Sequence, residues 1–176
     1  MEMWGGATFD VAVRFLKQDP WDRVKIFKKY VKKTPLKAVL RGQNIVGYQA
    51  YPDDVVEAFV YKAAEAGIDV FLIFDALQDL RNCETAFNAV KKAGKKIEGS
   101  VQYNLSPFNT INSFVNNALE QEQLGASLIH IEDMSGLMTP AAAYDIVSAM
   151  KKALKIPVHL HCHCTSGLAL MAYWKP

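Results

Sequence analysis

The chain has 176 residues, 51% hydrophobic and 22% charged, which fits one globular domain and excludes a disordered tail or a fibrous repeat. Its 20 Lys and Arg against 18 Asp and Glu leave a net charge of +2, too near balance for a nucleic-acid-binding protein. No apolar run approaches the ~18 residues of a transmembrane segment, and no export signal opens the chain. Two of its three cysteines lie too close together to link distant segments by a disulfide. A cytoplasmic protein is therefore expected.

Short β-branched or aromatic runs recur about every 30 residues and predict strands. They begin near Leu36, Ile68, Ile97, Leu128 and Val158. Between them, apolar residues at steps of three or four, for example over 21–31 and 80–90, predict helices with one buried face. Helix boundaries are marked by prolines suited to the first turn and by glycines that end a helix: Pro52, Pro140, Gly67, Gly94 and Gly125. This repeat predicts a parallel sheet, either an open doubly wound sheet or a (β/α)₈ barrel.

Polar residues at the strand ends favour the barrel, because the carboxyl ends of barrel strands form the mouth where active sites lie. They are Arg41, Asp75, Tyr103, Glu132, Asp133, His161 and His163. The segment after the first full strand, 41–44, is not the Gly-rich phosphate loop that would favour an open sheet. Five full strands plus residues 1–6 fall short of eight, and a barrel typically takes ~250 residues, so an incomplete barrel is expected.

The segment 157–164 carries the strongest chemical signal. Alternate residues of a strand share a face, so this run points three imidazoles the same way: His159, His161 and His163. Two such histidines can chelate a divalent ion such as Zn²⁺, Mn²⁺ or Co²⁺, with a carboxylate from Glu132 or Asp133 as a further ligand. The alternative is that these histidines are hydrogen-bonded core groups. A zinc site on Cys162 and Cys164 is less expected, because those side chains face the other way.

Arg41 is either an ion-pair partner or a clamp for a substrate carboxylate, which its fork geometry suits. Asp75 is equally a buried partner for Arg41 or a catalytic group. Tyr48 and Tyr103 are compatible with ordinary packing.

The sequence resembles the carboxyltransferase domain of biotin-dependent enzymes, which include oxaloacetate decarboxylase α subunits, pyruvate carboxylase and transcarboxylase. The similar motifs follow in order along essentially the whole chain: residues 2–10 (EMWGGATFD), 40–48 (LRGQNIVGY), 74–77 (FDAL), 133–137 (DMSGL) and 159–167 (HLHCHCTSG). The resemblance implies that residues 1–176 are one partial (β/α)₈ barrel domain, roughly the end of its second strand through its seventh. In that family a divalent metal polarises the carbonyl of a 2-keto acid, stabilising the enolate as CO₂ moves to or from biotin.

The resemblance also assigns roles by position. His161 and His163 match the two metal-binding histidines, Arg41 matches the arginine that orients the keto acid, and Asp10 and Tyr48 match residues of the biotin pocket. Biotin is then carried on a separate domain or subunit, and a homo-oligomer or multi-subunit complex is expected. Two family elements, a metal-binding Asp and a proton-shuttling Thr, would lie upstream of residue 1 and beyond residue 176.

Glu132 stands where the family has a lysine whose carbamylated side chain is the remaining metal ligand, and Leu72 replaces a common arginine. A glutamate keeps the carboxylate on a shorter stem, so direct ligation would need a shift of the metal or the backbone, or a bridging water. Two alternatives stay open. Glu132 and the missing strands motivate the first, an inactive or truncated paralogue that keeps only assembly contacts. The second is a metal-dependent lyase or aldolase of the condensing-enzyme type, which shares the H-x-H strand but not the motif from Arg41 to Tyr48.

Overall fold

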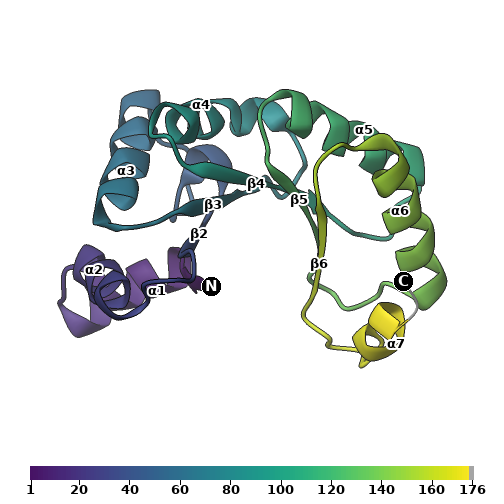
Figure 1. Cartoon of the computed structure of the whole chain (residues 1–176), viewed down its shortest axis with the longest axis horizontal. Helices are drawn as coiled ribbons and strands as arrows, with labels where there is room; N and C mark the ends of the chain where they lie inside the picture. Colours follow the sequence, from purple (N-terminus) through teal and green to yellow (C-terminus); the bar gives the residue numbers. More distant parts are fainter. Residues whose placement is uncertain (175–176) are drawn as a thin grey trace. The chain divides into compact units, whose positions relative to one another are not determined.

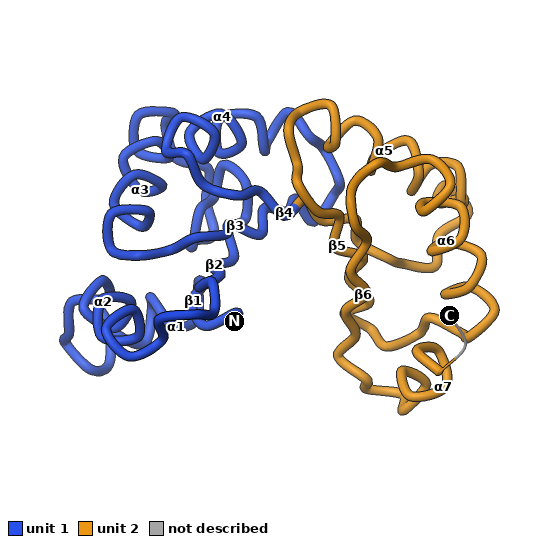
Figure 2. The backbone as a smooth tube through the Cα atoms, viewed as in Figure 1, with its two compact units in different colours: residues 1–98 blue, residues 99–176 orange. Residues whose placement is uncertain are grey.

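The structure is a computed structural model that describes residues 1–174, and the chain divides into two compact units, residues 1–98 and residues 99–176 (Figure 2). Strands and helices alternate along it, as the sequence predicts (Figure 1). The strands are β1 (Glu2–Trp4), β2 (Lys37–Leu40), β3 (Val70–Ile73), β4 (Lys96–Gln102), β5 (Leu128–Asp133) and β6 (Val158–Cys162). None of the helices within 1–174 is both long and apolar enough to cross a membrane.

In the first unit, β1, β2 and β3 pair in parallel in chain order. At the start of β4, Lys96 N–H donates a hydrogen bond to the carbonyl oxygen of Asp69, the residue before β3. The helices of this unit are α1 (Gly6–Val11), which continues into a π-helical turn (Ala12–Leu16), α2 (Pro20–Tyr30), α3 (Asp53–Ala66) and α4 (Glu84–Lys92), with 3₁₀ turns at Gly42–Asn44 and Leu80–Asn82. Helices α3 and α4 pack side by side (Figure 1).

The second unit continues the pattern. Directly after β4, Tyr103 N–H donates a hydrogen bond to the carbonyl oxygen of Glu132 in β5, and β5 pairs in parallel with β6. Its helices are α5 (Ile111–Gln123), α6 (Pro140–Ala153) and α7 (Ala169–Trp174), of which α5 packs against α6 and α6 against α7.

The strand order follows the chain from β1 to β6 without a reversal. A doubly wound sheet reverses its strand order at a switch point, whereas a barrel adds each strand next to the one before it. The order and the parallel pairing therefore confirm the predicted class, an incomplete (β/α)₈ barrel, with six strands among residues 1–174.

The predicted helix boundaries have clear local causes. Asp19 caps α2 by accepting a hydrogen bond from Trp21 N–H, and Thr139 caps α6, in which Pro140 is the first residue. Gly67 and the two other predicted helix-ending glycines all have positive φ, a conformation that glycine adopts without a Cβ clash. Pro52 differs slightly from expectation, since it lies one residue before α3.

Candidate metal and substrate site

Register places the metal-ligand candidates of the second unit beside each other. Glu132 of β5 pairs with His161 of β6, so both side chains project from the same face of the sheet. The third candidate, His163, follows β6 at once, and its N–H donates to the carbonyl oxygen of Asp133, which holds this segment against the end of β5.

These residues form a compact donor set. One ligand atom each from Glu132, His161 and His163 lie within 4.8 Å of one another, and the rings of His161 and His163 have centroids 5.1 Å apart. Glu132 and His161 are half-buried and His163 is exposed. Two imidazole nitrogens and a carboxylate oxygen are a ligand set that divalent Zn²⁺-like ions accept, and three protein ligands leave coordination positions open for a substrate. The residues therefore fit a catalytic type of metal centre.

The third predicted histidine, His159, contacts a different partner. Its ring lies edge-on to that of His130, with centroids 4.9 Å apart, and His130 in turn lies 5.1 Å from the ring of His161. His130 is 1% exposed and pairs with His159 in the strand register. His130 was not among the predicted residues. The sequence did contain a signal for it, because His130 and Glu132 are two positions apart in β5 and alternate residues of a strand face the same side.

Asp133, the other predicted carboxylate, has a different task. It is buried, and its side chain accepts hydrogen bonds from the N–H groups of Leu137 and Met138, which shapes the loop after β5. The Cys162 thiol lies 3.5 Å from the same carboxylate. Burial raises the pKa of this thiol, a hydrogen bond from the Cys164 N–H opposes that shift, and the negative charge of Asp133 adds to it. Glu132 is therefore the carboxylate that joins the histidine pair.

Arg41 lies in the first unit, directly after β2. Its Nη1 donates to the carbonyl oxygens of Val46 at 3.2 Å and Gly47 at 3.1 Å, and the guanidinium lies 5.0 Å from the centre of the Tyr48 ring. A Cβ on Gly6 would lie 2.7 Å from Nη1, so this arrangement needs a glycine at position 6. The contacts fix the guanidinium through Nη1 and leave its other donors for a ligand.

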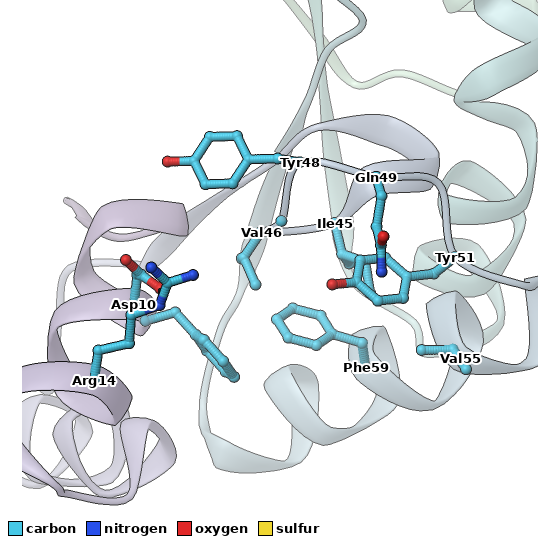
Figure 3. A pocket seen from close by; sticks show the side chains of 11 residues that line it. Asp10, Arg14, Ile45, Val46, Tyr48, Gln49, Tyr51, Val55 and Phe59 are labelled. Atoms are coloured by element: carbon cyan, nitrogen blue, oxygen red, sulfur yellow. The ribbon is translucent and has the colours of Figure 1, made fainter.

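A hollow of about 520 Å³ lies beside this loop in the first unit and contains both residues of the predicted biotin pocket, Asp10 and Tyr48. Figure 3 shows Asp10 and Arg14 on one side, Phe59 and Val55 on the other, and the 45–51 loop with Tyr48 above them. The Asp10 carboxylate pairs with Arg14 Nε at 2.8 Å. Tyr48 is 79% exposed although the Arg41 guanidinium lies near its ring, so most of the ring surface is accessible to a ligand. The hollow thus combines apolar side chains with the polar groups of Asp10, Arg14 and Tyr48.

The remaining predicted polar residues serve the loops and the core. The Asp75 carboxylate accepts hydrogen bonds from the N–H groups of Leu77 and Asp79, so it caps its own turn. Tyr103 packs against Phe114 with ring centroids 6.0 Å apart. Burial raises the pKa of the Tyr103 hydroxyl, and the negative charge of Asp133 raises it further.

Comparison with known proteins decides the family. The HMGL-like family matches residues 23–173. The chain belongs to the HMGL-like family.

Among its relatives, this HMGL-like chain is 51% identical to a pyruvate carboxylase subunit of Methanocaldococcus jannaschii, over 99% of the chain and 31% of the relative. It is 45% identical to the methylmalonyl-CoA carboxyltransferase 5S subunit of Propionibacterium freudenreichii, over 99% of the chain and 35% of that relative. The carboxyl transferase domain of Rhizobium etli pyruvate carboxylase, solved with pyruvate, superposes with a TM-score of 0.95 at 39% identity, covering 99% of the chain and 30% of the solved one. The predicted resemblance to biotin-dependent carboxyltransferase domains is confirmed, and the chain spans about a third of the length of these relatives.

Two side chains that support the site were not predicted. Gln102 and Ser100 of β4 are buried, and both make hydrogen bonds to the Glu132 carboxylate. Their signal in the sequence was alternation, because Ser100 and Gln102 continue a row of polar residues at every second position of β4, and alternate residues of a strand face the same side.

Proposed function

We propose that residues 1–176 act as one partial carboxyltransferase barrel domain, which takes part in biotin-dependent transfer of a carboxyl group to or from a 2-keto acid such as pyruvate or oxaloacetate. The observation that carries this proposal is the donor set of Glu132, His161 and His163, whose ligand atoms lie within 4.8 Å of one another. It is supported by relatives that are named pyruvate carboxylase or methylmalonyl-CoA carboxyltransferase.

In this proposal His161, His163 and Glu132 hold a divalent ion, Zn²⁺, Mn²⁺ or Co²⁺. When bound, the ion supplies Lewis-acid polarisation of the keto carbonyl. Glu132 is the only carboxylate of the donor set and is half-buried, which strengthens its attraction for a cation relative to a fully solvated group.

Arg41 orients the keto acid through its carboxylate. The hydrogen bonds from Nη1 to Val46 and Gly47 hold the guanidinium plane, so the remaining N–H groups offer a preformed fork for a planar anion. Asp10 and Tyr48 bind biotin in the 520 Å³ hollow, where Asp10 accepts hydrogen bonds and the Tyr48 ring covers an apolar part of the ligand.

We further propose that biotin arrives on a separate carrier domain or subunit, that the protein works as a homo-oligomer or in a multi-subunit complex, and that the reaction takes place in the cytoplasm. Two of the relatives are themselves named as subunits, which supports the assembly.

The direct test is decarboxylation of oxaloacetate by the full-length protein that contains this chain, with free biotin and added Mn²⁺, Zn²⁺ or Co²⁺. Pyruvate release should depend on biotin and on the metal, and Arg41→Lys should reduce it by raising the KM for oxaloacetate, because a lysine cannot form the two-point contact. Release that is unchanged without biotin would instead favour a metal-dependent lyase.

Glu132→Lys separates an enzyme from an inactive paralogue. If Glu132 is a working ligand, the lysine variant loses both metal and turnover, whereas Glu120→Lys, the same charge change on the exposed part of α5, keeps them. Turnover by neither the parent protein nor the lysine variant, with both folded and metal-loaded, would contradict the proposed enzyme and support the inactive paralogue.

A further inference from the structure

Two buried side chains of β4 hold the carboxylate of Glu132. Gln102 Nε2 donates a hydrogen bond to Glu132 Oε2 at 2.7 Å, and Ser100 Oγ donates to the same oxygen at 3.4 Å. Gln102 Nε2 also donates to Ser100 Oγ at 2.7 Å, so the two side chains support each other. The three residues belong to the second unit.

Burying these two polar side chains in the strand has a free-energy cost. Gln102 is 3% exposed and Ser100 is 4% exposed, at positions where alternate residues of the strand could be apolar. Burying an amide and a hydroxyl is unfavourable unless they are hydrogen bonded, and here their bonds converge on one carboxylate. A hydrogen bond to an ionised acceptor is also stronger than one between neutral groups.

The bonds restrict the carboxylate that faces the histidines. Glutamate has three rotatable side-chain bonds, and fixing Oε2 to the Gln102 amide removes most of that freedom while Oε1 keeps its lone pairs for another partner. Groups that orient a metal ligand in this way contribute to metal affinity although they never touch the metal.

We propose that Gln102 is a positioning residue of the metal centre, which fixes the Glu132 carboxylate beside His161 and His163 and so lets this chain complete a three-ligand cation site with its own side chains. The proposal rests on the proposed function, in which Glu132 is a metal ligand. Ser100 contributes less than Gln102 to fixing the Glu132 carboxylate, because its hydrogen bond to Glu132 is longer.

The test is titration of the metal-free, full-length chain with Co²⁺, followed by the absorption of the bound ion. Gln102→Met keeps the length of the side chain and removes the donor, and it should weaken Co²⁺ binding by about 10–100-fold. It should also change the Co²⁺ absorption band, because a freed carboxylate ligates with a different geometry.

Gln121→Met is the matched control. Gln121 is also a buried glutamine of the second unit, at 1% exposure, and donates to Ser100 C=O at 3.0 Å and Asn117 Oδ1 at 2.7 Å, but not to Glu132. Each variant loses a buried amide group that donates hydrogen bonds to two partners, so both should unfold more easily, and only Gln102→Met should lose Co²⁺ affinity. If Gln102→Met does not fold, Gln102→Asn replaces it, since its amide is one methylene too short to reach Oε2.

The outcomes separate the two proposals. No Co²⁺ binding by the parent chain would overturn the proposed metal function and this inference with it. Binding by the parent with equal affinity in Gln102→Met or Gln102→Asn would overturn the positioning role alone. An equal loss of affinity in the Gln102 variant and in Gln121→Met would show a general packing effect and would likewise overturn it.

Discussion

The donor set of Glu132, His161 and His163 predicts that the three histidines in and directly after β6 differ in their effect on metal binding. His161→Ala or His163→Ala removes one of three ligand atoms that lie within 4.8 Å of one another, whereas His159 is not a member of that set. A bound Zn²⁺ needs each donor at about 2.0–2.2 Å, which in tetrahedral geometry places donors roughly 3.4 Å apart. Small side-chain rotations achieve this with three donors, and two donors hold the ion far less well.

The size of the effect follows from linkage. At a free metal concentration 100 times its Kd, the parent gains about 2.7 kcal/mol of unfolding free energy, and a variant with 100-fold weaker binding gains about 0.4 kcal/mol at the same concentration. For a chain of this length 1 kcal/mol corresponds to roughly 2–4 °C in Tm. Metal should therefore raise the Tm of the parent and of His159→Ala by about 5–10 °C, and that of His161→Ala and His163→Ala by about 1–2 °C.

Scanning calorimetry with and without Zn²⁺, together with elemental analysis of the dialysed proteins, measures both quantities. An equal loss of the metal-induced shift in all three variants would refute the distinction drawn between His159 and the other two. No shift and no bound metal in the parent would refute the site itself.

Gly6→Ala should displace the Arg41 guanidinium, because the added Cβ would lie 2.7 Å from Nη1, and should lower the affinity of the full-length protein for pyruvate at least roughly tenfold, as for a misplaced binding group. Gly5→Ala, whose Cβ would meet only ordinary contacts from 3.4 Å, is the control, and equal pyruvate binding by both variants, measured by calorimetry, would contradict the argument. The ion pair of Asp69 and Lys28 predicts a pH dependence of stability. Burial raises the pKa of the Asp69 carboxyl, but hydrogen bonds from Lys28 and a backbone N–H outweigh burial and hold this pKa below its ordinary value of 3.8. A depressed pKa stabilises the folded state above the ordinary value and ceases to do so as the pH falls through the folded-state pKa. The difference in unfolding free energy between the parent and Asp69→Asn should therefore be largest near neutral pH and shrink below about pH 4, and a difference in urea unfolding that stays constant from pH 7 to about pH 3 would count against it.

The sequence predicted the fold well because its signals are local and repeated. Strand runs at regular spacing, helix-ending glycines and the proline at the start of α6 each act within a few residues, and the structure confirms them. Alternation also indicated that His159, His161 and His163 share a face, but it did not distinguish among them, and the choice of His161 and His163 as the metal ligands came from the family resemblance.

Which residues of neighbouring strands contact each other was harder to predict from the sequence. Glu132 and Asp133 are neighbours, and the sequence alone left both as possible ligands, although the pleat sends them to opposite faces and only Glu132 pairs across to His161. Gln102 is 30 residues away from Glu132 in the chain, and nothing local to it indicates a carboxylate partner. Its hydrogen bond to Glu132 follows from the alignment of β4 beside β5, which a single sequence does not specify.

The aromatic residues at the start of the chain have a practical consequence for watching the molecule fold. The rings of Trp4, Trp21 and Phe59 pack with centroids 5.1–5.7 Å apart, and Trp4 is only 2% exposed. The third and last tryptophan, Trp174, is 84% exposed, so it already has the surroundings of an unfolded chain. A change in tryptophan emission on unfolding therefore reports almost entirely on residues 1–98. Unfolding of the second unit would not be detected unless a second probe, such as bound Co²⁺, were measured at the same time.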